Sequence, residues 1–131
     1  MKKNIKMAFD HLSNDKVMSF LIEKFKDKID WGNRYNLNYA HSIANLIIEQ
    51  QISFKAAITI KKRFSKLIDK KSDLDIINMP NLDLQSIGIS FRKAEYIKNV
   101  FNFFDSKTID FNKMSDEEII DCLVSIKGVG E

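Results

Sequence analysis

The chain has 131 residues, of which 44% are hydrophobic and 30% are charged, a composition that supports one globular domain with an apolar core. Its single cysteine, Cys122, excludes an internal disulfide and a four-cysteine zinc or iron–sulfur site within this chain. No apolar run approaches the roughly 20 residues of a membrane span, and the basic start is not followed by the apolar segment of a secretory signal. The net charge of +3 permits a nucleic-acid partner without requiring one.

Apolar residues recur at helical spacing along almost the whole chain, which contains only one proline and four glycines. We therefore predict an all-α fold of about six to eight short helices. Residues 1–36 contain two short apolar stripes separated by Ser13-Asn14-Asp15, which supplies N-cap chemistry. A polar stretch from Asp27 to Asn38 is typical of a linker, so we expect one unit over 1–36 and a second over 37–131.

The second unit is divided by three serine caps. Ser53 and Ser90 each precede an amphipathic helix, and Ser115-Asp116-Glu117-Glu118 has the spacing of a capping box. Gly88, just before Ser90, is typical of a position beyond a helix end. The inner faces expected for the four main helices are Ile43, Leu46, Ile47 and Gln50; Ala57, Ile60, Phe64, Leu67 and Ile68; Ala94, Ile97, Phe101 and Phe104; and Ile119, Ile120, Leu123 and Val124.

The segment Ile126-Lys127-Gly128-Val129-Gly130 is the first candidate site. Its glycines permit a backbone conformation in which successive N–H groups point outward and bind an anion such as a phosphate. Lys127 adds a positive charge beside them. The alternative is a plain helix C-cap, in which glycine serves only the turn.

The segment Glu49-Gln50-Gln51-Ile52-Ser53 is the second candidate. Its two glutamines stand at a helix end, immediately before a helix whose outer face is basic, and amide side chains at such a junction can reach into a duplex. The alternative is an ordinary solvated helix terminus.

The third candidate is the helix start at Ser90, followed by Arg92 and Lys93. Cations are unfavourable near the positive end of a helix dipole, so an anionic partner would account for them. The alternative is a surface charge cluster without a ligand.

Taken in order, these segments resemble one family. Ile47-Ile48-Glu49-Gln50-Gln51-Ile52-Ser53, then Gly88-Ile89-Ser90-x-Arg92-Lys93-Ala94-x-Tyr96, then Ile126-Lys127-Gly128-Val129-Gly130 is similar to the 3-methyladenine DNA glycosylase II family of the helix–hairpin–helix base-excision repair superfamily. The resemblance runs from about Asp15 to the last residue. It implies a helix–hairpin–helix DNA glycosylase-like fold and a monofunctional enzyme that flips an alkylated base out of duplex DNA and hydrolyses its N-glycosidic bond. It also implies a cytoplasmic location, associated with the nucleoid in a prokaryote, and no membrane partner.

The resemblance also implies roles for individual residues. Gln51 matches the residue that fills the gap left by the flipped nucleotide, and the hairpin amides match those that hold a DNA phosphate. No cofactor is required, although backbone carbonyls at the hairpin can bind a monovalent cation. The DNA-binding residues implied are Gln50, Gln51, Ser53, Ser90, Lys93, Lys127, Gly128 and Gly130, and the cation-binding carbonyls are those of Val124, Ile126 and Val129.

One feature of that family is not matched in this sequence. Its catalytic aspartate lies about 20 residues past the hairpin, beyond Glu131, so the resemblance assigns no catalytic residue here and we expect the given chain to be an inactive fragment. Missing C-terminal helices would also leave Ile5, Phe9, Val17, Phe20 and Leu21 uncovered and favour self-association. Two other hypotheses remain open: a non-catalytic helix–hairpin–helix DNA-binding module, and a helical interaction domain without nucleic acid.

Overall fold

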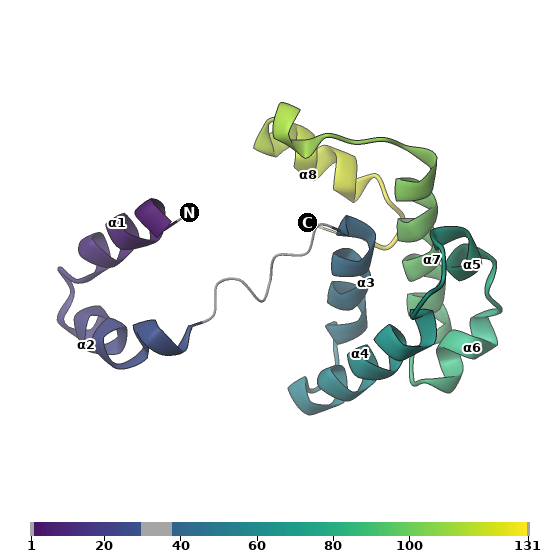
Figure 1. The fold of residues 1–131 in the computed structure, drawn as a ribbon, viewed down its shortest axis with the longest axis horizontal. Helices are drawn as coiled ribbons and strands as arrows, with labels where there is room; N and C mark the ends of the chain where they lie inside the picture. Colours follow the sequence, from purple (N-terminus) through teal and green to yellow (C-terminus); the bar gives the residue numbers. More distant parts are fainter. Residues whose placement is uncertain (1, 30–37, 131) are drawn as a thin grey trace. The chain divides into compact units, whose positions relative to one another are not determined.

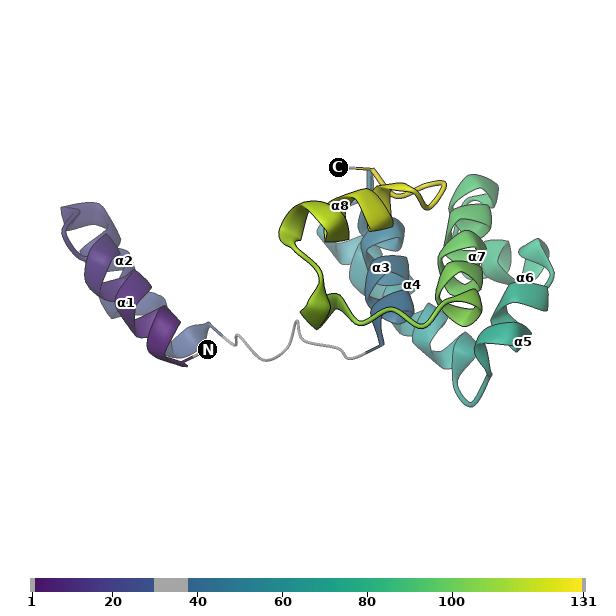
Figure 2. The ribbon, with the colours of Figure 1, turned by 90° about the horizontal axis from the view of Figure 1, so that it is seen from above.

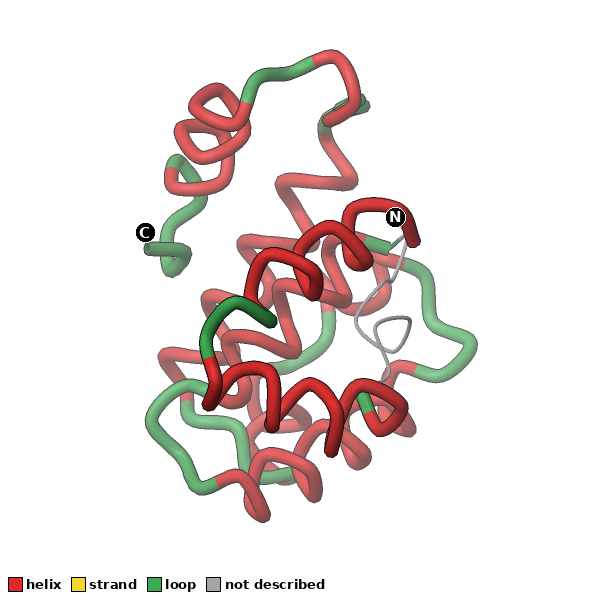
Figure 3. The backbone as a smooth tube through the Cα atoms, turned by 90° about the vertical axis from the view of Figure 1, so that its left-hand side faces the viewer, coloured by secondary structure: helices red, strands yellow, loops and turns green. Residues whose placement is uncertain are grey.

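The computed structural model describes residues 2–29 and 38–130, and every regular element in these ranges is helical (Figures 1 and 3). The prediction of an all-α fold is confirmed. The contacts divide the chain into two compact units, Met1–Tyr35 and Asn36–Glu131. The linker glycine, Gly32, and the boundary expected at residue 36 lie outside the described residues. None of the helices in the described ranges has the length and apolar character of a membrane span.

The first unit consists of α1 (Lys2–Leu12), α2 (Lys16–Phe25) and a 3₁₀ turn, η1 (Lys26–Lys28). Asp15 begins α2 as expected, because its side chain accepts hydrogen bonds of 2.9 Å from the amides of Val17 and Met18. No residue of α2 is buried. Among the five apolar residues expected to lack cover, Val17, Phe20 and Leu21 are exposed, whereas Ile5 and Phe9 are half-buried.

The second unit is built around α7 (Phe91–Ser106), which packs against α3 (Tyr39–Glu49), α5 (Asp73–Asn78) and α6 (Asn81–Ser86) (Figures 1 and 2). Helix α4 (Phe54–Ile68) packs against α3. The chain then continues through η2 (Phe111–Lys113) and α8 (Asp116–Val124). The centre of α7 is fully buried, with Ala94, Ile97, Val100 and Phe101 all inaccessible to solvent.

The expected inner faces hold for α4 and α7 but not for α3. Ala57, Phe64 and Ile68 are buried in α4, and Ile60 and Leu67 are half-buried. In α3 the buried residues are Ala40, Ala44, Ile47 and Ile48, whereas Leu46 is 56% exposed and Gln50 is exposed. The face is rotated because two alanines, which scarcely register in an apolar pattern, allow α3 to approach its neighbours closely. Helix α8 is only half-covered, since Ile120 and Val124 are exposed.

Candidate nucleic-acid interface

Helix α7 connects the three segments singled out in the sequence. Three of its residues follow one another at three-residue spacing: Lys93, Tyr96 and Asn99. Side chains at this spacing are neighbours on the surface of a helix. Lys93 contacts the α3–α4 turn, whereas Tyr96 and Asn99 contact the turn after α8. Ser90 caps the start of the same helix by accepting a hydrogen bond of 3.3 Å from the Lys93 amide. The three segments are therefore attached to one rigid element.

The ammonium group of Lys93 binds the C-terminal end of α3. Its Nζ donates hydrogen bonds to the backbone carbonyls of Ile48, at 2.8 Å, and Gln50, at 2.6 Å. Carbonyls at a helix end have no partner within the helix and carry its partial negative charge, so a cation stabilises them. Burial lowers the pKa of Lys93 from its usual 10.5. These carbonyls account for the position of Lys93 without an anion, and its contact with DNA stays a prediction.

Gln51 occupies the turn that Lys93 holds. Its φ of 57° lies in the left-handed region, which costs a residue with a Cβ about 1 kcal/mol. Lys70, just past the end of α4, has the same conformation (φ 60°), so the backbone of Gln51 is that of an ordinary helix end. The Gln51 side chain is exposed and has no hydrogen-bond partner within residues 2–29 and 38–130. It is therefore free to interact with a ligand.

The turn after α8 is closed by a hydrogen bond of 3.0 Å from the Val129 amide to the Ile126 carbonyl. Gly128, the third residue of this turn, has φ of 105°, which favours glycine. A Cβ on Gly128 would also lie only 2.1 Å from Cγ of Tyr96. Glycine is therefore required at this position both by the backbone conformation and by the close approach of the Tyr96 side chain. In contrast, a Cβ on Gly130 would meet nothing within 4 Å.

The same turn presents free backbone donors. Within the described residues, the amides of Lys127, Gly128 and Gly130 have no acceptor. Asn99 fixes the turn from the opposite side by donating a hydrogen bond of 3.1 Å from its side-chain amide to the Lys127 carbonyl. Unpaired amides next to an exposed lysine are donors that an anion can use, and the binding of a phosphate at this turn stays a prediction.

Two residues that hold this arrangement were not predicted as site residues. Tyr96 and Asn99 contact the hairpin turn, and only their spacing after Lys93 hinted at a shared surface.

Ser53 begins α4 as expected, because its hydroxyl oxygen accepts a hydrogen bond of 3.2 Å from the Ala56 amide. The hydroxyl hydrogens of Ser53 and Ser90 remain available to donate, since a serine oxygen can accept and donate at once.

Two curated proteins and one solved structure are similar to this chain. No family model matches the chain. A Bacillus subtilis protein, YfjP, whose name assigns it provisionally to the DNA-3-methyladenine glycosylases, is 24% identical over 98% of this chain and 47% of its own length. The DNA-3-methyladenine glycosylase of Saccharomyces cerevisiae is 32% identical over 71% of this chain and 36% of its own. The crystal structure of a Bacillus halodurans DNA-3-methyladenine glycosidase is 31% identical, with a TM-score of 0.64, over 72% of this chain and 46% of that one.

An all-α unit with a glycine hairpin and a polar turn held against one helix is a helix–hairpin–helix fold of the DNA glycosylase type. The chain spans less than half the length of the curated relatives it matches. Within that span, sequence and structure point to the same group of proteins. The chain belongs to the DNA-3-methyladenine glycosylase family.

Proposed function

We propose that this chain binds damaged double-stranded DNA as part of a base-excision repair N-glycosylase acting on alkylated purines such as 3-methyladenine. The observation that carries the proposal is the attachment of both the Gln51 turn and the hairpin turn to α7, through Lys93, Tyr96 and Asn99. One helix can thereby hold a phosphate-binding turn and a duplex-inserting side chain at a fixed separation. The names of the relatives support the same substrate class.

The proposed roles of the residues follow from their groups. The free amides of Gly128 and Gly130 bind a DNA phosphate, with Lys127 supplying charge. Gln51 fills the space left by a flipped nucleotide, and Gln50, Ser53, Ser90 and Lys93 flank it at the two helix junctions. The carbonyls of Val124, Ile126 and Val129 are proposed to bind a monovalent cation, although the Ile126 carbonyl already accepts one hydrogen bond and must use its second lone pair.

Base release is proposed for the complete enzyme rather than for these 131 residues alone. Hydrolysis of the N-glycosidic bond needs a carboxylate that stabilises positive charge developing on the sugar. Within the described residues no charged side chain is buried. Asp15 borders a hollow on the first unit, but its carboxylate is occupied in capping α2. We therefore assign that role to none of the described carboxylates.

Binding to a duplex that contains an abasic-site analogue tests the proposal. We expect salt-dependent affinity that falls when Lys127 is changed to Glu, because the reversed charge repels the phosphate at the free amides. Lys3→Glu, which makes the same charge change at an exposed position of the first unit, is the matched control and should bind nearly as well as the wild type. Equal losses in both variants, or no binding by the wild type, would contradict the proposal.

A base-release assay on alkylated duplex separates the enzyme from a DNA-binding module without catalysis. The 131-residue polypeptide should bind the duplex and release no 3-methyladenine, whereas the full-length protein should release it. Release by the polypeptide alone would overturn the assignment of catalysis to the complete enzyme. Binding without release by the full-length protein would favour the non-catalytic module.

A further inference from the structure

Helix α4 carries an unusual concentration of positive charge. Five of its 15 residues are basic and none is acidic; the basic residues are Lys55, Lys61, Lys62, Arg63 and Lys66. The whole chain has a net charge of only +3, so the residues outside α4 together are slightly negative. A face that serves only solubility normally mixes both signs, because a field of one sign repels itself. The imbalance in α4 therefore calls for an anionic partner.

Three of these cations form one line. At 100° per residue, Lys55, Lys62 and Lys66 fall within a narrow sector of the helix, directly opposite the buried side chains of Ala57 and Phe64. All three lysines are exposed, and none of their ammonium groups has a salt-bridge or hydrogen-bond partner among residues 2–29 and 38–130. We call these three residues the α4 stripe.

The other two cations of α4 are engaged within the protein. Lys61 forms a salt bridge of 2.7 Å with Glu49, and Arg63 donates a hydrogen bond of 3.4 Å to the Ile87 carbonyl. Both contacts join α4 to its neighbours. The three cations of α4 whose charged groups have no partner in the described residues are thus those that point away from the core.

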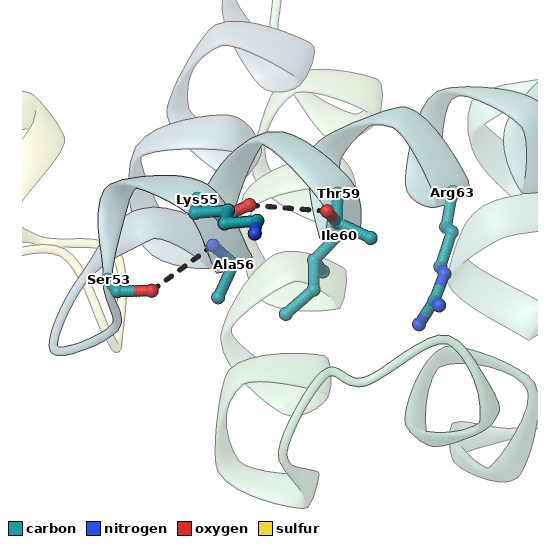
Figure 4. Close-up of a pocket in the computed structure, with 6 residues that line it drawn as sticks. All are labelled: Ser53, Lys55, Ala56, Thr59, Ile60 and Arg63. Atoms are coloured by element: carbon teal, nitrogen blue, oxygen red, sulfur yellow. Dashed lines mark hydrogen bonds between the residues drawn. The ribbon is translucent and has the colours of Figure 1, made fainter.

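A shallow hollow lies along the edge of the stripe. It has a volume of about 390 Å³ and is lined by Ser53, Lys55, Ala56, Thr59, Ile60 and Arg63, all from α4 and its cap (Figure 4). The rim therefore carries two hydroxyl groups and two cations, and the hollow begins at the turn that bears Gln51. Hydroxyl groups and cations are the side chains that contact phosphate oxygens in DNA complexes.

We infer that the α4 stripe is a second backbone-binding surface, which tracks the DNA strand away from the lesion. The inference rests on the proposed binding of DNA. From Lys55 to Lys66 the stripe rises about 16 Å at 1.5 Å per residue. Successive phosphates on one strand advance about 3.4 Å along the duplex, so the stripe spans about five of them. It thus extends the footprint on one side of the flipped nucleotide only.

The test compares two variants that each lose three charges. In the first, Lys55, Lys62 and Lys66 are all changed to Gln; in the control, Lys3, Lys6 and Lys16, which are exposed on the first unit, are changed to Gln. The affinity of the full 131-residue chain for an abasic-analogue duplex is measured by fluorescence anisotropy over a range of salt concentrations. Each lost phosphate contact reduces the slope of log K against log salt by about 0.9. We expect a reduction of about two to three for the stripe variant and less than about 0.5 for the control.

A duplex-length series gives the direction of the surface. The abasic analogue is placed near one end of the duplex, and the arm on its other side is lengthened step by step. The affinity of the wild type should rise until about five base pairs have been added. This rise should occur for one orientation of the damaged strand and not for the other. The stripe variant should gain nothing from either extension. Thermal melting of both variants checks that the fold is retained.

The outcomes distinguish a failure of the α4 inference from a failure of the proposed function. Equal slopes for the wild type and the stripe variant, with binding still lost on Lys127→Glu, would overturn the α4 inference and leave the proposed function in place. Equal slope changes in the stripe and control variants would show a net-charge effect and also overturn it. A wild-type chain that binds no duplex at any salt concentration would overturn both.

Discussion

Lys93 donates a 2.6 Å hydrogen bond to the backbone carbonyl of Gln50, a residue 43 positions earlier in the chain. Its ammonium also binds the Ile48 carbonyl, so one side chain of α7 closes the exposed end of α3. The turn that follows, with Gln51 at its tip, is thereby fixed to the helix that also contacts the hairpin.

Replacing Lys93 with Met should remove both hydrogen bonds while keeping most of the apolar stem. Because charge-assisted hydrogen bonds contribute about 1.5–3 kcal/mol, we expect the free energy of unfolding in urea to fall by about that amount. Lys98→Met, on the same helix, is the control and should cost less than about 0.5 kcal/mol. A Lys93→Met protein as stable as the wild type would show that the carbonyls are satisfied by water instead.

Gly128 and Gly130 should respond very differently to alanine. Gly128→Ala places a Cβ against the Tyr96 ring and forces a left-handed conformation on a residue that resists it. Overpacking and backbone strain together should lower the free energy of unfolding by about 2–4 kcal/mol. Gly130→Ala, whose Cβ meets open space, should change it by less than about 0.5 kcal/mol. Equal effects in urea denaturation would contradict the contact with Tyr96.

Gln51→Gly should separate stability from DNA recognition. Glycine adopts φ of 57° without strain, so we expect the protein to gain up to about 1 kcal/mol in stability. The variant lacks the side chain proposed to fill the duplex, so its preference for abasic over intact DNA should fall about tenfold, or about 1.4 kcal/mol.

Lys70→Gly is the matched control for that experiment, because Lys70 has nearly the same φ at the end of α4. It should gain similar stability and keep the preference for abasic DNA. A Gln51→Gly protein with an undiminished preference would rule out the insertion of Gln51.

The capping box of α5 predicts a dependence of stability on pH. Hydrogen bonds from the Ser72 hydroxyl and amide hold the pKa of Asp75 below its usual 3.8. The folded state therefore binds the proton less well than the unfolded state does. The stabilisation is fully present above about pH 4 and is lost as the pH falls through the lowered pKa.

Asp75→Asn should remove this part of the pH dependence of unfolding. Ser72→Ala should remove only the share due to the hydroxyl, because the backbone amide at position 72 still donates to Asp75, and the double variant should flatten the profile no further than Asp75→Asn. Urea denaturation between pH 2.5 and 5 provides the measurement. Additive effects in the double variant would show that the two residues act independently.

Local sequence signals predicted much of the fold. Ser53, Ser90 and Ser115 begin helices because a hydroxyl oxygen satisfies an amide that the helix leaves unpaired, and this depends only on residues nearby. The burial of Phe64 and Phe101 followed from their spacing among other apolar residues. The face of α3 was wrong, because the close packing of Ala40 and Ala44 depends on neighbouring helices rather than on apolar periodicity.

The site was predicted in its parts but not in its connections. The hairpin, the glutamine turn and the Ser90 cap each leave a signal within a few residues. The contacts of Lys93 with Gln50 and of Asn99 with Lys127 join residues 43 and 28 positions apart, and no local pattern encodes them. For the same reason Lys93 was interpreted as a binding group for an external anion, when α3 supplies carbonyls to it.

Helix α7 also bears on which molecule, protein or DNA, would deform in the proposed complex. The hairpin turn at Gly128 and the turn that carries Gln51 are both held against α7, so the separation of the two turns is set before any ligand binds. In the proposed complex the duplex, rather than the protein, would adjust its shape to contact both turns, and the energy required would depend on how easily that duplex deforms. If the proposed binding of DNA holds, a duplex already weakened by a lesion would deform at a lower energy than an intact one, and this difference would favour damaged sites before any contact with the altered base.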